Sequence, residues 1–144
     1  MQSPSHCADK LNGLLKGEIA AVETYEQALE KITNPDIRLE LEDVQQCHAD
    51  RAGLLTRTVA SMGKEPTQGG GPWGAFAKLI EGGAKVFGEK AAIGVLEEGE
   101  DKGLADYRKL QEDSDPIIHS IVKELLPRQE ETHAKMSSLK QRLH

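Results

Sequence analysis

The sequence predicts a single all-α domain across residues 1–144, folded as an up-down four-helix bundle. The composition is the first indication, because Ala, Leu, Glu, Lys and Gln are abundant whereas Val, Ile and aromatic residues are few. Apolar residues also recur every three or four positions, which is the period of an amphipathic helix. In addition, three prolines each follow a residue that caps helices well: Ser3-Pro4, Asn34-Pro35 and Asp115-Pro116.

These signals divide the chain into four predicted helices, at residues 4–32, 35–62, 89–112 and 116–143. The links after the first and the third helix are only two or three residues long, so each pair should form an antiparallel hairpin. Residues 63–88 make a long crossover that could travel the length of the bundle. This crossover holds a Gly-rich turn and an amphipathic stretch, which predicts a short extra helix.

The charge pattern argues against two classes of partner. Acidic and basic residues are interleaved, with a net charge of −6 and no basic run that could follow a phosphate backbone, so we expect no nucleic acid to bind. No apolar stretch approaches the roughly 20 residues that cross a bilayer, and the first residues lack the basic and apolar regions of a signal peptide. We therefore expect no membrane association, a cytoplasmic location, and a monomer or homodimer.

Each predicted helix carries a polar residue on its apolar stripe. Glu18 lies on the stripe of helix 4–32, His48 on that of helix 35–62, and Glu100 on that of helix 89–112. The stripe of helix 116–143 passes through either Gln129 or Glu130 and then His133. A titratable side chain in an apolar core is unfavourable unless it is paired, neutralised or bound to a metal, so these positions need a common explanation.

An internal repeat relates the two hairpins. The pattern Glu18-x6-Tyr25 recurs as Glu100-x6-Tyr107, and Gln45-x-x-His48 resembles Glu130-x-x-His133. Because a helix rises about 1.5 Å per residue, the polar residues of both hairpins should meet at one level of the bundle. One Glu from each of two helices, with a Glu-x-x-His from each of the others, is the pattern of a dinuclear carboxylate site, and oxygen with imidazole ligation suits iron or manganese.

The chain resembles the ferritin and rubrerythrin superfamily on these residues, and within it the small, uncharacterised bacterial ferritin-like proteins. The resemblance covers most of the chain, including the extra helix in the crossover. It implies that Glu18 and Glu100 are single-helix carboxylate ligands, that Glu130 is a bridging carboxylate, and that His48 and His133 are imidazole ligands. Rubrerythrin-like sites of this kind reduce peroxide or oxidise ferrous iron.

The sequence departs from that family pattern at one position. Gln45 stands where the family has a bridging Glu, and an amide is a weaker, neutral ligand. Glu97, three residues before Glu100 and on the same helix face, resembles an extra glutamate of rubrerythrin-like sites and could replace the missing carboxylate. Tyr25 and Tyr107 are expected to hydrogen-bond a carboxylate across the bundle or to donate an electron. Because Gln45 is a weak ligand, two alternatives to a dinuclear site are not excluded: the site could hold one metal ion, or no metal at all.

Two functional hypotheses follow from the sequence. The first is a di-iron or di-manganese protein that reacts with oxygen or peroxide or handles iron. The second is a non-enzymatic, metal-free helical protein, whose core polar residues form a satisfied hydrogen-bond network and which acts under stress by associating with itself or a partner.

Overall fold

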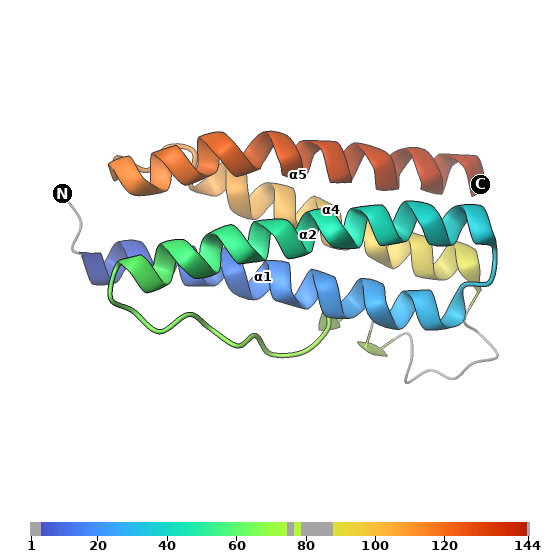
Figure 1. Cartoon of the computed structure of the whole chain (residues 1–144). Coiled ribbons are helices and arrows are strands. Elements are labelled where there is room, and N and C mark those ends of the chain that lie inside the picture. Colours follow the sequence, from blue (N-terminus) through green and yellow to red (C-terminus); the bar gives the residue numbers. More distant parts are fainter. Residues whose placement is uncertain (1–3, 75–76, 79–87, 144) are drawn as a thin grey trace.

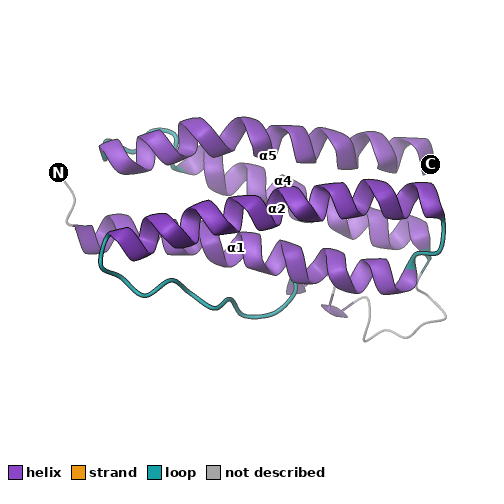
Figure 2. Ribbon diagram, viewed as in Figure 1, coloured by secondary structure: helices purple, strands orange, loops and turns teal. Residues whose placement is uncertain are grey.

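The structure is a computed structural model that describes residues 4–74, 77–78 and 88–143. It contains four long helices: α1 (Pro4–Lys31), α2 (Pro35–Ser61), α4 (Glu89–Lys109) and α5 (Pro116–Leu143). The predicted all-α four-helix bundle is confirmed, and the described part of the chain holds no strand (Figure 2). Most of the short helix predicted within 63–88 falls outside the described residues.

The helix boundaries follow from the capping signals. The Asn34 side chain accepts hydrogen bonds from the backbone N–H groups of Asp36 (2.9 Å) and Ile37 (3.2 Å), and Asp115 accepts one from Ile117 (2.9 Å). α2 ends before Gly63, whose φ of +78° is a conformation that glycine adopts readily. α1, α2 and α4 end slightly before their predicted last residues.

Two antiparallel hairpins, α1–α2 and α4–α5, make up the bundle. They pack with α1 against α4 and with α2 against α5, so that α1 and α5 lie diagonally across the core. α2 ends and α4 begins at opposite ends of the bundle, and the crossover must therefore travel its length (Figure 1). The helix directions run up, down, down and up. None of the described helices is long and apolar enough to cross a membrane.

Hydrogen bonds hold the described part of the crossover against α1. Asn12 donates to the carbonyl of Glu65 (3.1 Å) and accepts from the backbone N–H of Thr67 (2.9 Å), and the backbone N–H of Trp73 donates to the Thr24 hydroxyl (2.8 Å). The Trp73 indole lies directly on Gly99 of α4, where an added Cβ would stand only 2.2 Å from the ring. A glycine at this position therefore lets the crossover cover the seam between α1 and α4.

The core consists of two apolar clusters with a polar layer between them. One cluster surrounds Tyr25, Leu41 and Ile93, and the other surrounds Leu15, Leu55 and Leu125. The layer between them contains buried polar side chains from all four helices, namely Glu18, His48, Arg51, Glu100, Gln129 and Thr132. The polar layer therefore interrupts a core that is otherwise apolar.

Candidate functional site

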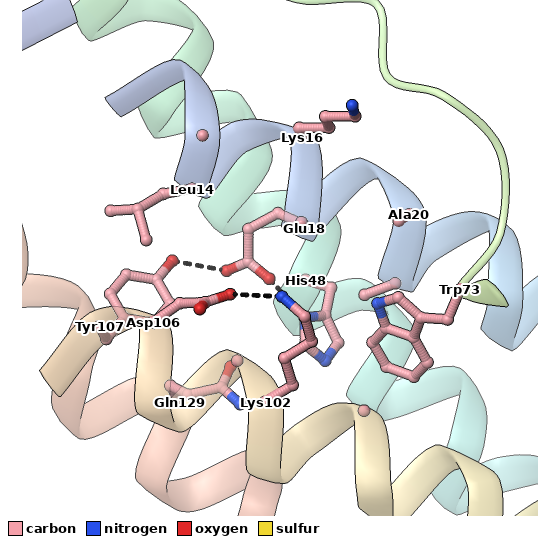
Figure 3. A pocket seen from close by; sticks show the side chains of 15 residues that line it. Leu14, Lys16, Glu18, Ala20, His48, Trp73, Lys102, Asp106, Tyr107 and Gln129 are labelled. Atoms are coloured by element: carbon pink, nitrogen blue, oxygen red, sulfur yellow. Dashed lines mark hydrogen bonds and ion pairs between the residues drawn. The ribbon is translucent and has the colours of Figure 1, made fainter. Parts of the chain in front are cut away.

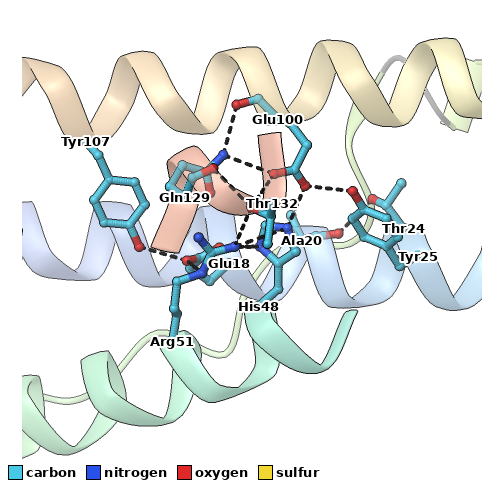
Figure 4. Close-up of polar contacts among 10 residues, drawn as sticks. All are labelled: Glu18, Ala20, Thr24, Tyr25, His48, Arg51, Glu100, Tyr107, Gln129 and Thr132. Carbon is cyan, nitrogen blue, oxygen red and sulfur yellow. Dashed lines mark hydrogen bonds and ion pairs between the residues drawn. The ribbon is translucent and has the colours of Figure 1, made fainter. Parts of the chain in front are cut away.

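The polar layer is the candidate site, and every helix contributes to it. Glu18 comes from α1, His48 and Arg51 from α2, Glu100 from α4, and Gln129 and Thr132 from α5 (Figure 4). None of these residues is more than 4% exposed. Water can therefore solvate their charges very little, and their interactions with one another must stabilise them instead.

His48 bridges the two buried carboxylates. Its Nδ1 lies 2.6 Å from Glu18 Oε1 and its Nε2 lies 2.6 Å from Glu100 Oε2. A carboxylate oxygen only accepts, so both ring nitrogens donate and the ring is an imidazolium. Burial alone would lower the pKa of His48, but the charges of Glu100 and Glu18 outweigh it and raise this pKa to about 9.

Arg51 brings a second cation into the layer. Its Nε lies 2.8 Å from Glu18 Oε2, and its Nη2 donates to the Thr132 hydroxyl at 3.3 Å. Nη2 also approaches His48 Nδ1 to 2.7 Å, which is a close contact between two donors, because a doubly protonated imidazole has no lone pair to offer. The two carboxylates and the two cations thus balance each other in charge.

The two tyrosines reach across the bundle to the repeat-related carboxylates. Tyr25 donates to Glu100 Oε2 at 2.6 Å, and Tyr107 donates to Glu18 Oε2 at 2.7 Å. Burial, followed by the charge of the adjacent carboxylate, raises the pKa of each phenol well above 10. The predicted contact between each tyrosine and a buried carboxylate is confirmed, and both phenols stay protonated as donors.

Glu100 has the largest set of donors in the layer. Thr132 donates to its Oε1 at 2.7 Å, and Gln129 Nε2 donates to its backbone carbonyl at 2.9 Å and to its Oε1 at 3.2 Å. Burial would raise the pKa of Glu100, but the His48 charge and the hydrogen bonds from His48, Tyr25 and Thr132 lower it to about 2. Glu100 is therefore a carboxylate throughout the neutral pH range.

The prediction that Glu130 and His133 face the core is wrong. Glu130 is exposed, with a carboxylate oxygen 4.0 Å from Arg108, and His133 is half-buried beside Asp101 on the outer face of α4 and α5. The buried residues of α5 instead include a strict alternation of four-residue and three-residue steps: Ile118, Val122, Leu125, Gln129, Thr132, Met136 and Leu139. A register one residue later turns a helical side chain by about 100°, away from the core.

Gln45 and Glu97 also lie outside the layer, contrary to prediction. Gln45 Nε2 donates to the Val22 carbonyl (3.1 Å) and to Glu26 (2.8 Å) at the seam between α1 and α2, because Val44 takes the core position there. Glu97 instead meets Asp101 and His133, with one possible ligand atom of each residue within 4.8 Å of the others. These three residues form a second cluster, which we call the surface triad.

Sequence reasoning missed Arg51 and Thr132, and it offered Gln129 only as an alternative. Continuing from Val44 and His48 by alternating steps of four and three residues leads to Arg51, but the apolar Ala52 beside it looked the better core residue. The internal repeat of the two hairpins also points to these positions. Gln129 and Thr132 stand 81 residues after His48 and Arg51, close to the spacing of 82 between Glu18 and Glu100.

A pocket between α1 and α4 leads from the surface to the polar layer. It has a volume of about 330 Å³ and reaches Glu18, His48 and Gln129 at its floor (Figure 3). Its mouth carries Lys16 and Lys102, and glycines of both helices line its walls. Part of the buried layer is therefore open to a small ligand.

Comparison with known proteins gives one match. A family model described as "Domain of unknown function (DUF2383)" matches residues 6–113, which include nearly all of α1 and the whole of α2 and α4. No curated protein and no solved structure matches the chain.

The buried Arg51 should be far more important for stability than an exposed arginine on the same helix. We expect Arg51→Gln to lower the free energy of unfolding by roughly 3–5 kcal/mol, because it leaves two buried carboxylates, Glu18 and Glu100, with only one cation, His48, to balance them. Arg57→Gln, at an exposed position of α2, should change it by less than about 0.5 kcal/mol. Urea denaturation followed by circular dichroism measures both values. Equal effects of the two substitutions would show that Arg51 does not balance the layer.

Stability should depend on pH through His48 and Glu100. His48 has a folded pKa of about 9 against an ordinary 6.5, so its contribution is complete below about pH 6.5 and is lost as the pH rises through 9. Glu100, at about 2 against 4.5, contributes fully above about pH 4.5 and loses this contribution as the pH falls through 2. The free energy of unfolding should therefore be greatest between about pH 4.5 and 6.5. His48→Gln should remove the alkaline decline; a parallel decline in both proteins would contradict this assignment.

Proposed function

The chain belongs to the DUF2383 family of domains of unknown function, and we propose that it is a metal-independent binding protein and not a di-iron enzyme. One observation carries this proposal. Both ring nitrogens of His48 are engaged, each with a different carboxylate, at 2.6 Å. A metal ligand must offer a lone pair, and an imidazolium held between two carboxylates has none.

The other residues of the layer fit a dinuclear metal centre equally poorly. Where the second half of such a site needs a carboxylate and an imidazole, α5 presents Gln129 and Thr132, which are neutral. Two divalent cations would also have to enter a layer whose carboxylates already face Arg51 and His48. An arginine stays charged under all ordinary conditions, so the added positive charge would be unbalanced.

A ferritin-like relationship in fold is part of the proposal. The long crossover between two antiparallel hairpins supports it, as do the glutamates on α1 and α4 that face each other near mid-bundle. A shared fold hosts many functions, and the chemistry has to be inferred from the site. We infer that this chain keeps the bundle and holds protein cations where relatives of that kind would hold metal.

The role we assign to the polar layer is to fix how the two hairpins pair. Glu18 of the first hairpin contacts Tyr107 of the second, and Glu100 of the second contacts Tyr25 and His48 of the first. A shifted pairing would leave a buried charge without a partner, which destabilises a protein by several kcal/mol. The result is a rigid bundle suited to presenting a pocket or surface to a binding partner.

A second candidate function, binding of a single metal ion, is favoured by the surface triad. Glu97 and Asp101 are four residues apart on α4, and His133 approaches them from α5. Two carboxylates and one imidazole suit manganese, iron or zinc. Lys140 lies 3.5 Å from Glu97 and competes for that carboxylate. Such a site would be partly exposed and separate from the core.

Metal analysis of the purified protein tests the core and the surface separately. The protein is expressed in iron- and manganese-supplemented cells, as wild type, His133→Gln and His48→Gln. Because His133 belongs only to the surface triad, any metal that survives its substitution must come from the core. We expect the His133→Gln protein to contain no stoichiometric metal. Stoichiometric iron that persists in His133→Gln and is lost in His48→Gln would overturn the proposal.

Two further variants, compared with the wild type, test the surface triad. Calorimetric titration with Mn²⁺ or Zn²⁺ should show one site in the wild type, no site in Asp101→Asn, and an unchanged site in Glu98→Gln, which alters an exposed neighbour on α4. Binding that Asp101→Asn leaves intact would remove the triad as a candidate.

A further inference from the structure

The pocket between α1 and α4 has the dimensions of a small-molecule site. Its volume of about 330 Å³ is at the lower end of the range for ligand pockets. This is room for roughly eleven groups of the size of a water molecule, at about 30 Å³ each. A nucleotide or haem is too large, and a single-ring organic molecule fits.

Four glycines line the walls of the pocket, so at these positions the helix backbone carries no side chain of its own. Gly13 and Gly17 of α1 line it, and a Cβ added to either would meet nothing within 4 Å. Gly99 and Gly103 line it from α4, where a Cβ would collide with Trp73 and Gln129 respectively. A glycine inside a helix lowers stability by about 1 kcal/mol relative to alanine. Open space is therefore left beside Gly13 and Gly17 of α1, whereas Trp73 and Gln129 fill the space beside Gly99 and Gly103, and the slot that results suits a flat molecule.

The floor of the pocket holds a buried acceptor without a donor. Gln129 is 1% exposed, and its Oε1 has no hydrogen-bond partner among the described residues. The amide cannot be turned round to correct this, because its Nε2 donates to two oxygens of Glu100. Figure 3 shows this side chain among those that line the pocket. A buried acceptor left unpaired destabilises a protein by about 1–3 kcal/mol, and a ligand hydroxyl or N–H would relieve this.

The mouth of the pocket carries two lysines and one aspartate, Lys16, Lys102 and Asp106, on a protein whose net charge is −6. Lys102 pairs with Asp106 at 3.3 Å, whereas Lys16 makes no ion pair with any described residue. The crossover runs beside Lys16, since a Cβ on Gly70 would lie 3.4 Å from its Cε. The mouth therefore favours a ligand with an anionic group at the end that faces solvent.

From these features we propose that the pocket binds a small planar organic acid, a hydroxylated aromatic carboxylate. The ring lies in the open space beside Gly13 and Gly17 of α1, next to Trp73. The hydroxyl donates to Gln129 Oε1 at the floor, and the carboxylate faces Lys16 and Lys102 at the mouth. Gln129 keeps its bonds to Glu100, and only its buried Oε1 has to shift slightly toward the pocket to admit the hydroxyl.

Calorimetric titration of the full chain with three probes tests this assignment. 4-Hydroxybenzoate has both polar groups, benzoate lacks the hydroxyl, and phenol lacks the carboxylate. We expect 4-hydroxybenzoate to bind with a Kd below about 1 mM, and benzoate to bind about tenfold more weakly, which is the effect of one hydrogen bond. Lys16→Gln should weaken 4-hydroxybenzoate and benzoate by about two- to fivefold and leave phenol unchanged.

A pair of glycine variants tests the location. Gly17→Leu fills the slot and should abolish binding, whereas Gly94→Leu, on α4 outside the pocket, should leave the Kd unchanged. Both replace a helical glycine around which a Cβ meets nothing within 4 Å, so both proteins should fold, which circular dichroism checks. No binding by the wild type at about 10 mM, equal affinity for 4-hydroxybenzoate and benzoate, or binding that survives Gly17→Leu would overturn the proposal. The metal analysis described above tests the proposed function of the core, and its outcome does not depend on these binding results.

Discussion

Two carboxylates, a guanidinium and an imidazolium lie almost completely buried in the middle of the core, and the bundle depends on their mutual neutralisation. An isolated buried ion is unfavourable by several kcal/mol, so each charge requires its partners to be in place. The partners come from different helices. Sliding one helix by a turn, about 5.4 Å, would separate them. The apolar clusters on either side supply most of the buried surface, and the polar layer determines which arrangement of the helices buries it.

The layer is symmetric in one respect and asymmetric in another. Glu18 with Tyr25, and Glu100 with Tyr107, are equivalent in the two hairpins, and each tyrosine binds the other hairpin's glutamate. The remaining positions differ, because α2 contributes two cations whereas α5 contributes a neutral amide and a hydroxyl. A metal centre built from two equal halves would need the same ligands in both hairpins. Here the two cations of α2 neutralise the glutamates of α1 and α4. Because α5 contributes only neutral groups, one acceptor, Gln129 Oε1, has no donor on the side of the pocket.

The sequence was sufficient for the helices and for half of the layer. Capping residues and apolar periodicity are local signals, so the four elements could be placed, and Glu18, His48 and Glu100 followed from the stripes they interrupt. The prediction for α5 was wrong because the Glu130-x-x-His133 motif lies one residue after the residues that face the core. Which of the two registers faces the core depends on the rotation of the helix about its axis, and no local sequence signal determines that rotation. Arg51 escaped because arginine is rarely buried, and its burial here depends on partners from α1 and α5 that only the tertiary structure brings near.

The protonation state of His48 is the most direct test of this account. Nitrogen NMR of histidine-labelled protein, with His48 assigned among the five histidines by the His48→Gln variant, distinguishes an imidazolium from a neutral ring. At pH 7 both ring nitrogens should carry protons, and they should keep them until the pH approaches 9. A neutral His48 at pH 7, with one nitrogen unprotonated, would contradict the account, because that nitrogen would carry a lone pair able to bind a metal.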